Sequence, residues 1–249
     1  MFGKIFPRVK RKLSDKIFQL IEPQIDKAVN RHVKNMLLQN RRFQEHVKVR
    51  LDGIGLEHEF FKDSPRECQD RYELLALAIE QAGRVNGLWL EFGVSGGASV
   101  NFIAKKIGRT VYGFDSFEGL PEDWVKSRSN TQPKGSMSQN EQLPPSEANV
   151  QFVRGWFRDT LPRFLENHRE PAAFVHIDSD LYSSAKCVLE KLRFQNGSVI
   201  VFDEYYNYPL WRDGEHKAFQ EFLAARAFRS KCIGYCPFDK QAAFLLETS

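Results

Sequence analysis

Two pairs of acidic residues follow two apolar runs of the sequence, and their carboxylates could bind a metal ion or accept a proton. Asp178 and Asp180 follow the run AFVHI, and Asp203 and Glu204 follow the run SVIVF. If both runs are neighbouring parallel strands, the four carboxylates meet at one edge of the sheet. Unpaired, they would repel one another, and Mg²⁺, Mn²⁺ or Ca²⁺, which favour oxygen ligands, would relieve the repulsion. The alternative is that helix capping and lysine side chains neutralise them.

A glycine-rich corner precedes these acids. The stretch LWLEFGVSGGASVNFIA reads as a strand, a tight turn and a helix, which is the order of a nucleotide-binding corner. The dinucleotide fingerprint G-x-G-x-x-G is absent, because Ser95 stands at its second glycine. Glu91 would repel a pyrophosphate but attract the positive charges of S-adenosylmethionine (SAM). The corner therefore favours SAM, bound by Glu91, Gly93, Val94, Ser95 and Ser99.

Further candidate SAM contacts follow the next two apolar runs. Asp115 lies 22 positions after Gly93, near the spacing at which an acid binds ribose hydroxyls. Ser116 adjoins it and belongs to the same predicted site. The alternative for Asp115 is that it caps the following turn. Trp156 or Phe157 could flank the adenine, or could belong to the core.

Seven β-rich runs, most of them separated by helix-compatible stretches, must position these residues. They span 88–92, 110–114, 150–153, 173–177, 198–202, 231–236 and 241–247. The alternation predicts an α/β fold with a parallel sheet covered on both faces. The last two runs are joined by PFDK, which is too short for a crossover and predicts an antiparallel hairpin. The polar stretch 121–149 is typical of a lid or of disorder.

The charge distribution separates an N-terminal arm from the rest of the chain. Residues 1–50 hold 13 Lys or Arg and four Asp or Glu, whereas the remaining residues hold 23 and 28. We therefore expect a basic helical arm over residues 1–69 and one domain over 70–249. An acidic main domain argues against nucleic acid as its partner. The arm could contact a membrane surface or a partner, or pack on the domain or on another subunit.

Other bulk features bear on location. No run approaches 18 apolar residues, and the basic start is not followed by the apolar region of a signal peptide. The four cysteines are widely spread and form no CxxC pair, which is typical of reduced thiols in the cytoplasm. We expect a cytoplasmic homo-oligomer, with peripheral membrane contact through the arm as the alternative.

The motifs LEFGVSGGAS, VYGFDSFEGLP, HIDSDLY and VIVFDEYYNYP together resemble the class I SAM-dependent methyltransferases. More narrowly, residues 70–247 resemble the macrocin- and novobiocin-type sugar O-methyltransferases. The resemblance implies a Rossmann-like fold with a mostly parallel seven-stranded sheet. It also implies that Asp178, Asp203 and Glu204 ligate Mg²⁺ and that Asp180 is the general base. The second acid pair of the family is often Asp-Asp, whereas here it is Asp203-Glu204.

The expected reaction is methylation of a sugar hydroxyl, with the cation lowering the pKa of the hydroxyl and Asp180 taking its proton. His216 is an alternative base, a partner of the base, or a surface residue. A catechol O-methyltransferase is the second reading, because YYNYPLW would suit a flat ring or form core. A non-catalytic SAM-fold protein that docks a partner or membrane through its arm is the third. A nicotinamide-dependent dehydrogenase is disfavoured by the missing fingerprint and by Glu91.

Overall fold

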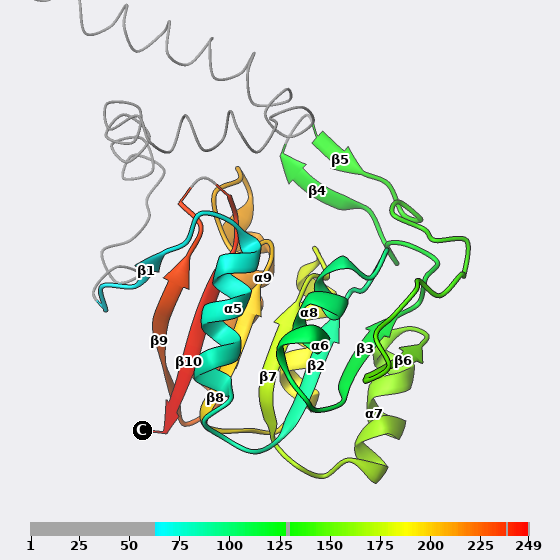
Figure 1. Cartoon of the computed structure of the whole chain (residues 1–249). Coiled ribbons are helices and arrows are strands. Elements are labelled where there is room, and N and C mark those ends of the chain that lie inside the picture. Colours follow the sequence, from blue (N-terminus) through cyan, green and yellow to red (C-terminus); the bar gives the residue numbers. More distant parts are fainter. Residues whose placement is uncertain (1–62, 128–129, 238, 249) are drawn as a thin grey trace, which may run out of the picture. The chain divides into compact units, whose positions relative to one another are not determined.

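A central β-sheet runs through the computed structural model, which describes residues 63–127, 130–237 and 239–248 (Figure 1). The strand order is β1-β9-β10-β8-β7-β2-β3-β6. The strands are β1 Arg66–Glu67, β2 Leu88–Phe92, β3 Val111–Asp115, β6 Val150–Arg154, β7 Ala172–Ile177, β8 Phe194–Phe202, β9 Phe228–Tyr235 and β10 Ala242–Thr248. The pairs from β6 through β3, β2 and β7 to β8 are parallel, while β10 is antiparallel to β8 and β9. These pairings confirm the mostly parallel α/β sheet and its C-terminal hairpin.

The prediction of seven strands is wrong, because the sheet has an eighth strand at its edge. This strand, β1, is two residues long and pairs in parallel with β9, with Arg66 opposite Gly234 and Glu67 opposite Tyr235. Both residues of β1 are exposed and charged, so no apolar pattern marks the strand in the sequence. β1 also lies inside the range 1–69 that the sequence assigns to the arm.

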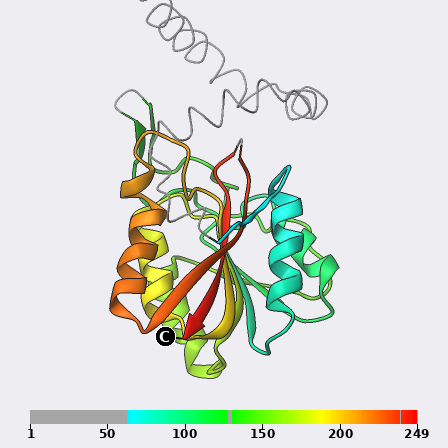
Figure 2. The ribbon, with the colours of Figure 1, turned by 90° about the vertical axis from the view of Figure 1, so that its left-hand side faces the viewer.

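Helices cover both faces of the sheet (Figure 2). They are α5 Arg71–Ala82, α6 Ala98–Lys106, α7 Phe157–Asn167, α8 Tyr182–Lys191 and α9 Glu215–Ala225, with a short 3₁₀ turn, η1, at Trp211–Asp213. Helices α7, α8 and α9 share one buried apolar cluster with the sheet, and α5 and α6 share the other. The domain is therefore a three-layer structure with one core on each side of the sheet.

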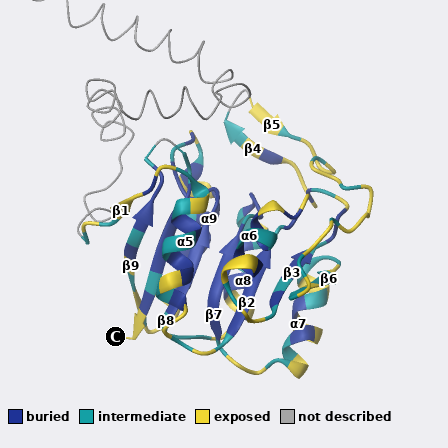
Figure 3. Ribbon diagram, viewed as in Figure 1, coloured by how far each residue is buried: buried dark blue, intermediate teal, exposed yellow. Residues whose placement is uncertain are grey.

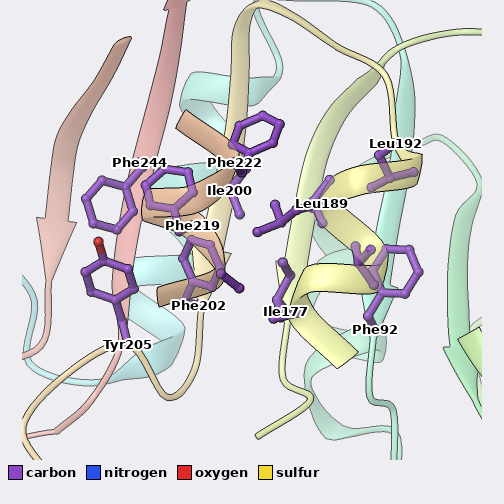
Figure 4. Packing of buried hydrophobic residues seen from close by; sticks show 14 of the residues in the cluster. Phe92, Ile177, Leu189, Leu192, Ile200, Phe202, Tyr205, Phe219, Phe222 and Phe244 are labelled. Atoms are coloured by element: carbon purple, nitrogen blue, oxygen red, sulfur yellow. The ribbon is translucent and has the colours of Figure 1, made fainter. Parts of the chain in front are cut away.

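Aromatic packing holds α9 against β8 and β10 (Figure 4). The ring of Phe219 lies 5.0 Å from that of Phe202 on β8 and 4.9 Å from that of Phe244 on β10. All three rings are buried. Rings at these separations attract one another beyond the area that they bury. The start of α9 is thereby held beside the end of β8.

Helix α5 begins and ends at sequence signals. The Asp70 side chain accepts hydrogen bonds from the backbone N–H groups of Tyr72 and Glu73, which caps the first turn. The helix ends before Gly83. Its first residue, Arg71, is thereby fixed beside the end of β8, where it bonds Asp203.

Side-chain alternation along the central strands decides which residues face which core. Leu90 on β2 packs into the cluster of α7–α9, whereas Trp89 packs into the cluster of α5 and α6. Glu91 is two positions from Trp89 and therefore faces the α5–α6 side. His176 on β7 follows the same rule from Phe174, and the strand register places it opposite Glu91. Figure 3 shows these strands buried between the helical layers.

Residues 121–149, predicted as a lid or as disorder, contain a small sheet of their own. Its strands are β4 Trp124–Ser127 and β5 Asn130–Gln132, which pair antiparallel. Trp124 packs into a small buried cluster with Leu120 and Leu181. These strands could not be predicted, because runs of three and four mostly polar residues show no alternation.

The predicted arm falls outside the described residues, apart from positions 63–69. Within the part that the structure describes, no helix is both long enough and apolar enough to cross a bilayer.

Candidate active site

Two adjoining cavities open at the carboxyl ends of β2, β3, β7 and β8. The first has a volume of about 440 Å³ and the second of about 330 Å³. Four residues line both cavities: Ser95, Met137, Asp178 and Asp180. A molecule in the first cavity would therefore share a wall with a molecule in the second.

The glycine corner forms one side of the first cavity. At this corner the ends of β2 and β7 come very close to each other. Gly93 has φ +94°, and a Cβ atom built on it would lie 1.9 Å from the carbonyl oxygen of Asp178. The Asp178 N–H donates to the carbonyl of Phe92 across the same gap, at 2.8 Å. Only glycine meets both the backbone conformation and the close approach at this position.

We expect Gly93→Ala to destabilise the protein and to abolish SAM binding. The unfavourable φ alone costs on the order of 1–3 kcal/mol, and the backbone contact adds to it. Thermal unfolding and calorimetry with SAM measure the two effects. Gly96→Ala is the matched control, because a Cβ atom there meets nothing within 4 Å. Equal stability of Gly93→Ala and Gly96→Ala would contradict the requirement for glycine at position 93.

Asp115 ties the glycine corner to the end of β3. Its Oδ2 accepts the N–H groups of Val94 and Ser95, both at 2.8 Å, and its Oδ1 accepts that of Phe117 at 2.7 Å. The capping alternative is thus present in the structure. Because a carboxylate oxygen accepts two hydrogen bonds, Oδ1 retains room for one further donor. Asp115 lines the first cavity, so a ligand hydroxyl there can reach it.

The predicted SAM-binding residues divide between the two cavities. The first is lined by Gly93, Ser95, Asp115, Ser116 and Trp156, and the second by Val94, Ser95 and Ser99. Glu91 is among the lining residues of neither and is fully buried. Its Oε1 accepts the Ser99 hydroxyl at 2.7 Å, and its Oε2 lies 3.4 Å from Nδ1 of His176. The structure therefore places Glu91 beneath the corner and in contact with protein groups.

The four acids meet at the second cavity. Its lining includes Asp178, Asp180, Asp203 and Glu204. Ligand atoms of His176, Asp178 and Asp203 lie within 4.8 Å of one another, which is a spacing that one metal ion could bridge. The two acid pairs thus converge at one sheet edge, as the parallel strands predict.

Cationic side chains also enter this cluster. Arg71 forms an ion pair with Asp203, and its Nη1 lies 3.7 Å from Oδ2 of Asp178. The ammonium of Lys240 lies 3.2 Å from Oε1 and 3.1 Å from Oε2 of Glu204. Basic side chains of the protein therefore neutralise part of the charge of the acids. The sequence alone left open whether a cation or basic side chains would do so.

We expect Arg71→Gln to lower the free energy of unfolding and to make it more dependent on Mg²⁺. The loss should be smaller than the roughly 3–5 kcal/mol of a broken, fully buried pair, because the Arg71 side chain is 33% exposed. Added Mg²⁺ should recover more stability in this variant than in the wild type, since a counter-charge is missing. Thermal unfolding with EDTA and with Mg²⁺ measures both effects. Arg66→Gln, which breaks an exposed pair with Glu73, is the control. Stability equal to that of the control would contradict the expectation.

A buried histidine joins the acids to the glycine corner. Burial alone would lower the pKa of His176, but Asp203 and Glu91 on its two sides raise it to about 10. Nε2 of His176 lies 3.9 Å from Oδ1 of Asp203. The two neighbouring carboxylates therefore favour the protonated form of His176. It stabilises two carboxylates that lie on opposite sides of it.

The carboxylates differ in their proton affinity. Burial raises the pKa of Asp180 to about 6, because Lys126 opposes the shift only in part and Asp203 adds to it. Burial would also raise the pKa of Asp203, but His176 and Arg71 hold it below the ordinary carboxyl value. Asp180 is thus the more basic of the two, and its φ of +63° is a strained conformation of the kind found at functional sites.

The pKa of Glu204 is raised as well. Burial raises its pKa to about 8, with Lys240 opposing the shift. Burial thus favours the protonated form of Glu204, and the Lys240 ammonium favours the ionised form. A ligand cation would favour its ionised form.

His216 and the tyrosines that begin the aromatic stretch are not part of the walls of the two cavities. His216 packs its ring 4.6 Å from that of Trp211, and burial followed by Arg212 lowers its pKa to about 4. Tyr205 and Tyr206, from the aromatic stretch, are buried in the core. Neither the histidine nor these tyrosines line either cavity.

Sequence reasoning missed Arg71, His176 and Glu215. The signal for His176 is a lone histidine inside an otherwise apolar strand, two positions before Asp178. Arg71 carries no local signal, since it is one of 36 basic residues and meets Asp203 from 132 positions away. Glu215, fully buried at the start of α9, stands beside the histidine that the sequence singled out.

Comparison with known proteins relates this chain to a protein family. The profile of the macrocin-O-methyltransferase (TylF) family matches residues 67–233. The 8-demethyl-8-(2,3-dimethoxy-alpha-L-rhamnosyl)-tetracenomycin-C 4'-O-methyltransferase of Streptomyces olivaceus is 30% identical over 146 residues, which are 50% of this chain and 55% of that protein. The demethyldecarbamoylnovobiocin O-methyltransferase of Streptomyces niveus is 28% identical over 121 residues, 42% of this chain and 45% of that protein. The matched region spans about half the length of each relative.

Solved structures show the same fold. The calicheamicin methyltransferase CalS11 has a TM-score of 0.57 at 24% identity, over 86% of this chain and 90% of that one. The O-methyltransferase NovP has a TM-score of 0.52 at 23% identity, over 72% and 80%. With the strand order and the family profile, these similarities identify a Rossmann-like methyltransferase fold. The chain therefore belongs to the macrocin-O-methyltransferase family.

Proposed function

We propose that this protein transfers the methyl group of SAM to a hydroxyl oxygen of a sugar or of a glycosylated small molecule. The observation that carries the proposal is the wall of Ser95, Met137, Asp178 and Asp180 shared by the two cavities. Methyl transfer needs donor and acceptor side by side, with the reacting atoms in line. The names of the two Streptomyces relatives support a sugar or glycosylated acceptor.

The first cavity fits SAM through the chemistry of its lining. Asp115 has acceptor capacity for a ribose hydroxyl on Oδ1, and Trp156 offers an aromatic wall for a base. We assign this cavity to the cofactor and the second cavity to the acceptor. SAM supplies a methyl group that is already activated by a positively charged sulfur.

We also propose that Asp178, Asp203 and Glu204 bind Mg²⁺ or Mn²⁺. The donor set is made of carboxylate oxygens, and within the described residues Oδ1 of Asp203 is buried without a hydrogen-bond partner. Arg71 and Lys240, which pair with these acids, are the groups that a cation would have to displace or accommodate. A bound cation would supply positive charge that lowers the pKa of an acceptor hydroxyl.

Asp180 is the proposed general base. It lies on the shared wall, so its carboxylate can take the hydroxyl proton while the oxygen bonds to the methyl carbon and the carbon–sulfur bond breaks. Its pKa, raised to about 6 by burial, leaves it ionised at neutral pH yet more basic than an exposed aspartate. The products are the methyl ether, S-adenosylhomocysteine and a protonated Asp180.

A screen of acceptors tests this function. Purified protein, SAM and Mg²⁺ are mixed with glycosides and with catechols, and release of S-adenosylhomocysteine is measured. The proposal expects release with glycosides. Release with catechols alone would favour the flat-ring alternative, and binding of SAM with no turnover on any acceptor would favour a non-catalytic protein. Calorimetry should show binding of SAM and none of NADH.

We propose that the basic arm serves self-association or membrane contact and that the protein acts in the cytoplasm. The four cysteines are free thiols, which suits a reducing compartment. A chain that begins at Leu51 should bind SAM normally but lose self-association or vesicle binding. Light scattering and vesicle sedimentation of both chains measure this. If both properties are unchanged, the arm has neither role.

A further inference from the structure

Glu215 joins the two loops that carry the four acids. It is the first residue of α9, and its side chain is fully buried. Its Oε1 accepts the backbone N–H of Ser179 at 3.3 Å, and its Oε2 accepts that of Glu204 at 3.1 Å. Ser179 lies between two of the acids on the loop after β7, and Glu204 is itself one of the acids after β8. One carboxylate thus spans both loops.

These two bonds begin where the backbone ladder of the sheet ends. The N–H of Asp203 still donates to the carbonyl of Ile177, at 2.9 Å. One residue further along the chain, beyond the end of β8, the N–H of Glu204 donates to the Glu215 side chain instead. Glu215 thereby supplies the acceptors that a strand would supply, and a buried N–H left without an acceptor is costly.

The helix that carries this carboxylate is itself anchored. Phe219, one turn after Glu215, packs between Phe202 and Phe244, and Figure 4 shows these rings meeting between α9 and the strands. The carboxylate is therefore held in place from the core side. A movement of α9 would move both acid loops together.

We propose that Glu215 is a positioning residue that sets the spacing between the acid pair after β7 and the acid pair after β8. This inference rests on the function proposed for the second cavity. A two-oxygen side chain is required, because each loop donates to a different oxygen. Glutamine has nearly the same shape but one acceptor oxygen, and its NH₂ group cannot accept an N–H. It would release one loop.

The test compares Glu215→Gln with Glu221→Gln on the same helix. Glu221 accepts bonds from Tyr182 and Lys186 at the surface and touches neither acid loop. Hydrogen exchange at the amides of Ser179 and Glu204, followed by NMR, should be faster by about tenfold at one or both in Glu215→Gln. Because a displacement of about 1 Å can cost 10²-fold in rate, kcat should fall by about that factor. The dissociation constant of SAM should not change, and Glu221→Gln should match the wild type throughout.

Three results would overturn the inference. The first is unchanged exchange at both amides, the second is unchanged kcat, and the third is a loss of SAM affinity as large as the loss of kcat, which would show a general structural role. If Glu215→Gln does not fold, Glu215→Asp carries the same test, because it keeps two oxygens on a shorter arm. The exchange measurement needs no substrate. If the wild type methylates no acceptor, the proposed function is refuted. The exchange result still tests whether Glu215 holds the two loops through its hydrogen bonds.

Discussion

Replacing Asp180 with asparagine should lower kcat by about 10²–10⁴-fold, the range typical of losing a general base. The amide keeps the shape of the side chain but cannot take a proton. Asparagine also tolerates the left-handed backbone of this residue, whose φ is +63°. The substitution therefore removes the basic group with little change in structure. Initial rates of S-adenosylhomocysteine release at saturating substrates measure the effect.

Binding measurements separate this role from a structural one. In Asp180→Asn, SAM affinity and cation affinity should change far less than kcat, because the glycine corner is held by Asp115 and the cation site is assigned to other acids. Asp159→Asn, which alters an exposed acid on α7, is the matched control and should keep full turnover. Turnover of Asp180→Asn equal to that of this control would remove Asp180 from the mechanism.

Removal of divalent cations with EDTA should abolish turnover, and Mg²⁺ or Mn²⁺ should restore it. The physical reason is that a cation held by the proposed acids would lower the pKa of the acceptor hydroxyl and would favour the ionised form of Glu204. SAM binding should survive EDTA, since the ribose is assigned to Asp115 in the first cavity and not to the cation site. The two measurements are turnover and calorimetry on the same metal-free sample.

Asp203→Asn should reproduce the effect of EDTA at saturating Mg²⁺. It removes one negative charge with little change in side-chain shape. Arg71 and His176 both lie beside this carboxylate and would lose its charge. Cation binding, followed by calorimetry, should weaken together with turnover. Asp213→Asn, an exposed acid beside α9, should leave both unchanged. Full turnover in EDTA, on an acceptor that the enzyme demonstrably methylates, would exclude the metal from the reaction.

The sheet could be predicted from the sequence wherever a strand is a continuous apolar run. The run 88–92 coincides with β2, and 173–177 lies within β7, because both strands are buried on both faces. The prediction failed where strands are polar. It missed β1, and it started β8 at position 198 although the strand begins at Phe194, where the residues are only partly buried.

The positions of the acids could also be predicted, because the carboxyl ends of parallel strands share one edge. Their partners could not. Arg71 and Lys240 lie near opposite ends of the domain's sequence, far from the acids that they contact. No local sequence pattern encodes such contacts. Glu91 was expected to face the ligand, but strand alternation directs it to the α5–α6 side, where it contacts Ser99 and His176. Which face a strand residue occupies follows from the packed sheet and is ambiguous in an isolated run.

The most direct measurement of the central claim follows the methyl group itself. The protein is incubated with Mg²⁺, a glycoside that it turns over and SAM that carries an isotope-labelled methyl group, and the product is analysed by mass spectrometry and NMR. The shared wall of the two cavities predicts one labelled methyl on a sugar hydroxyl oxygen, with one S-adenosylhomocysteine released per methyl transferred. Release of S-adenosylhomocysteine without label on the glycoside, or label on a carbon or nitrogen atom, would contradict the account.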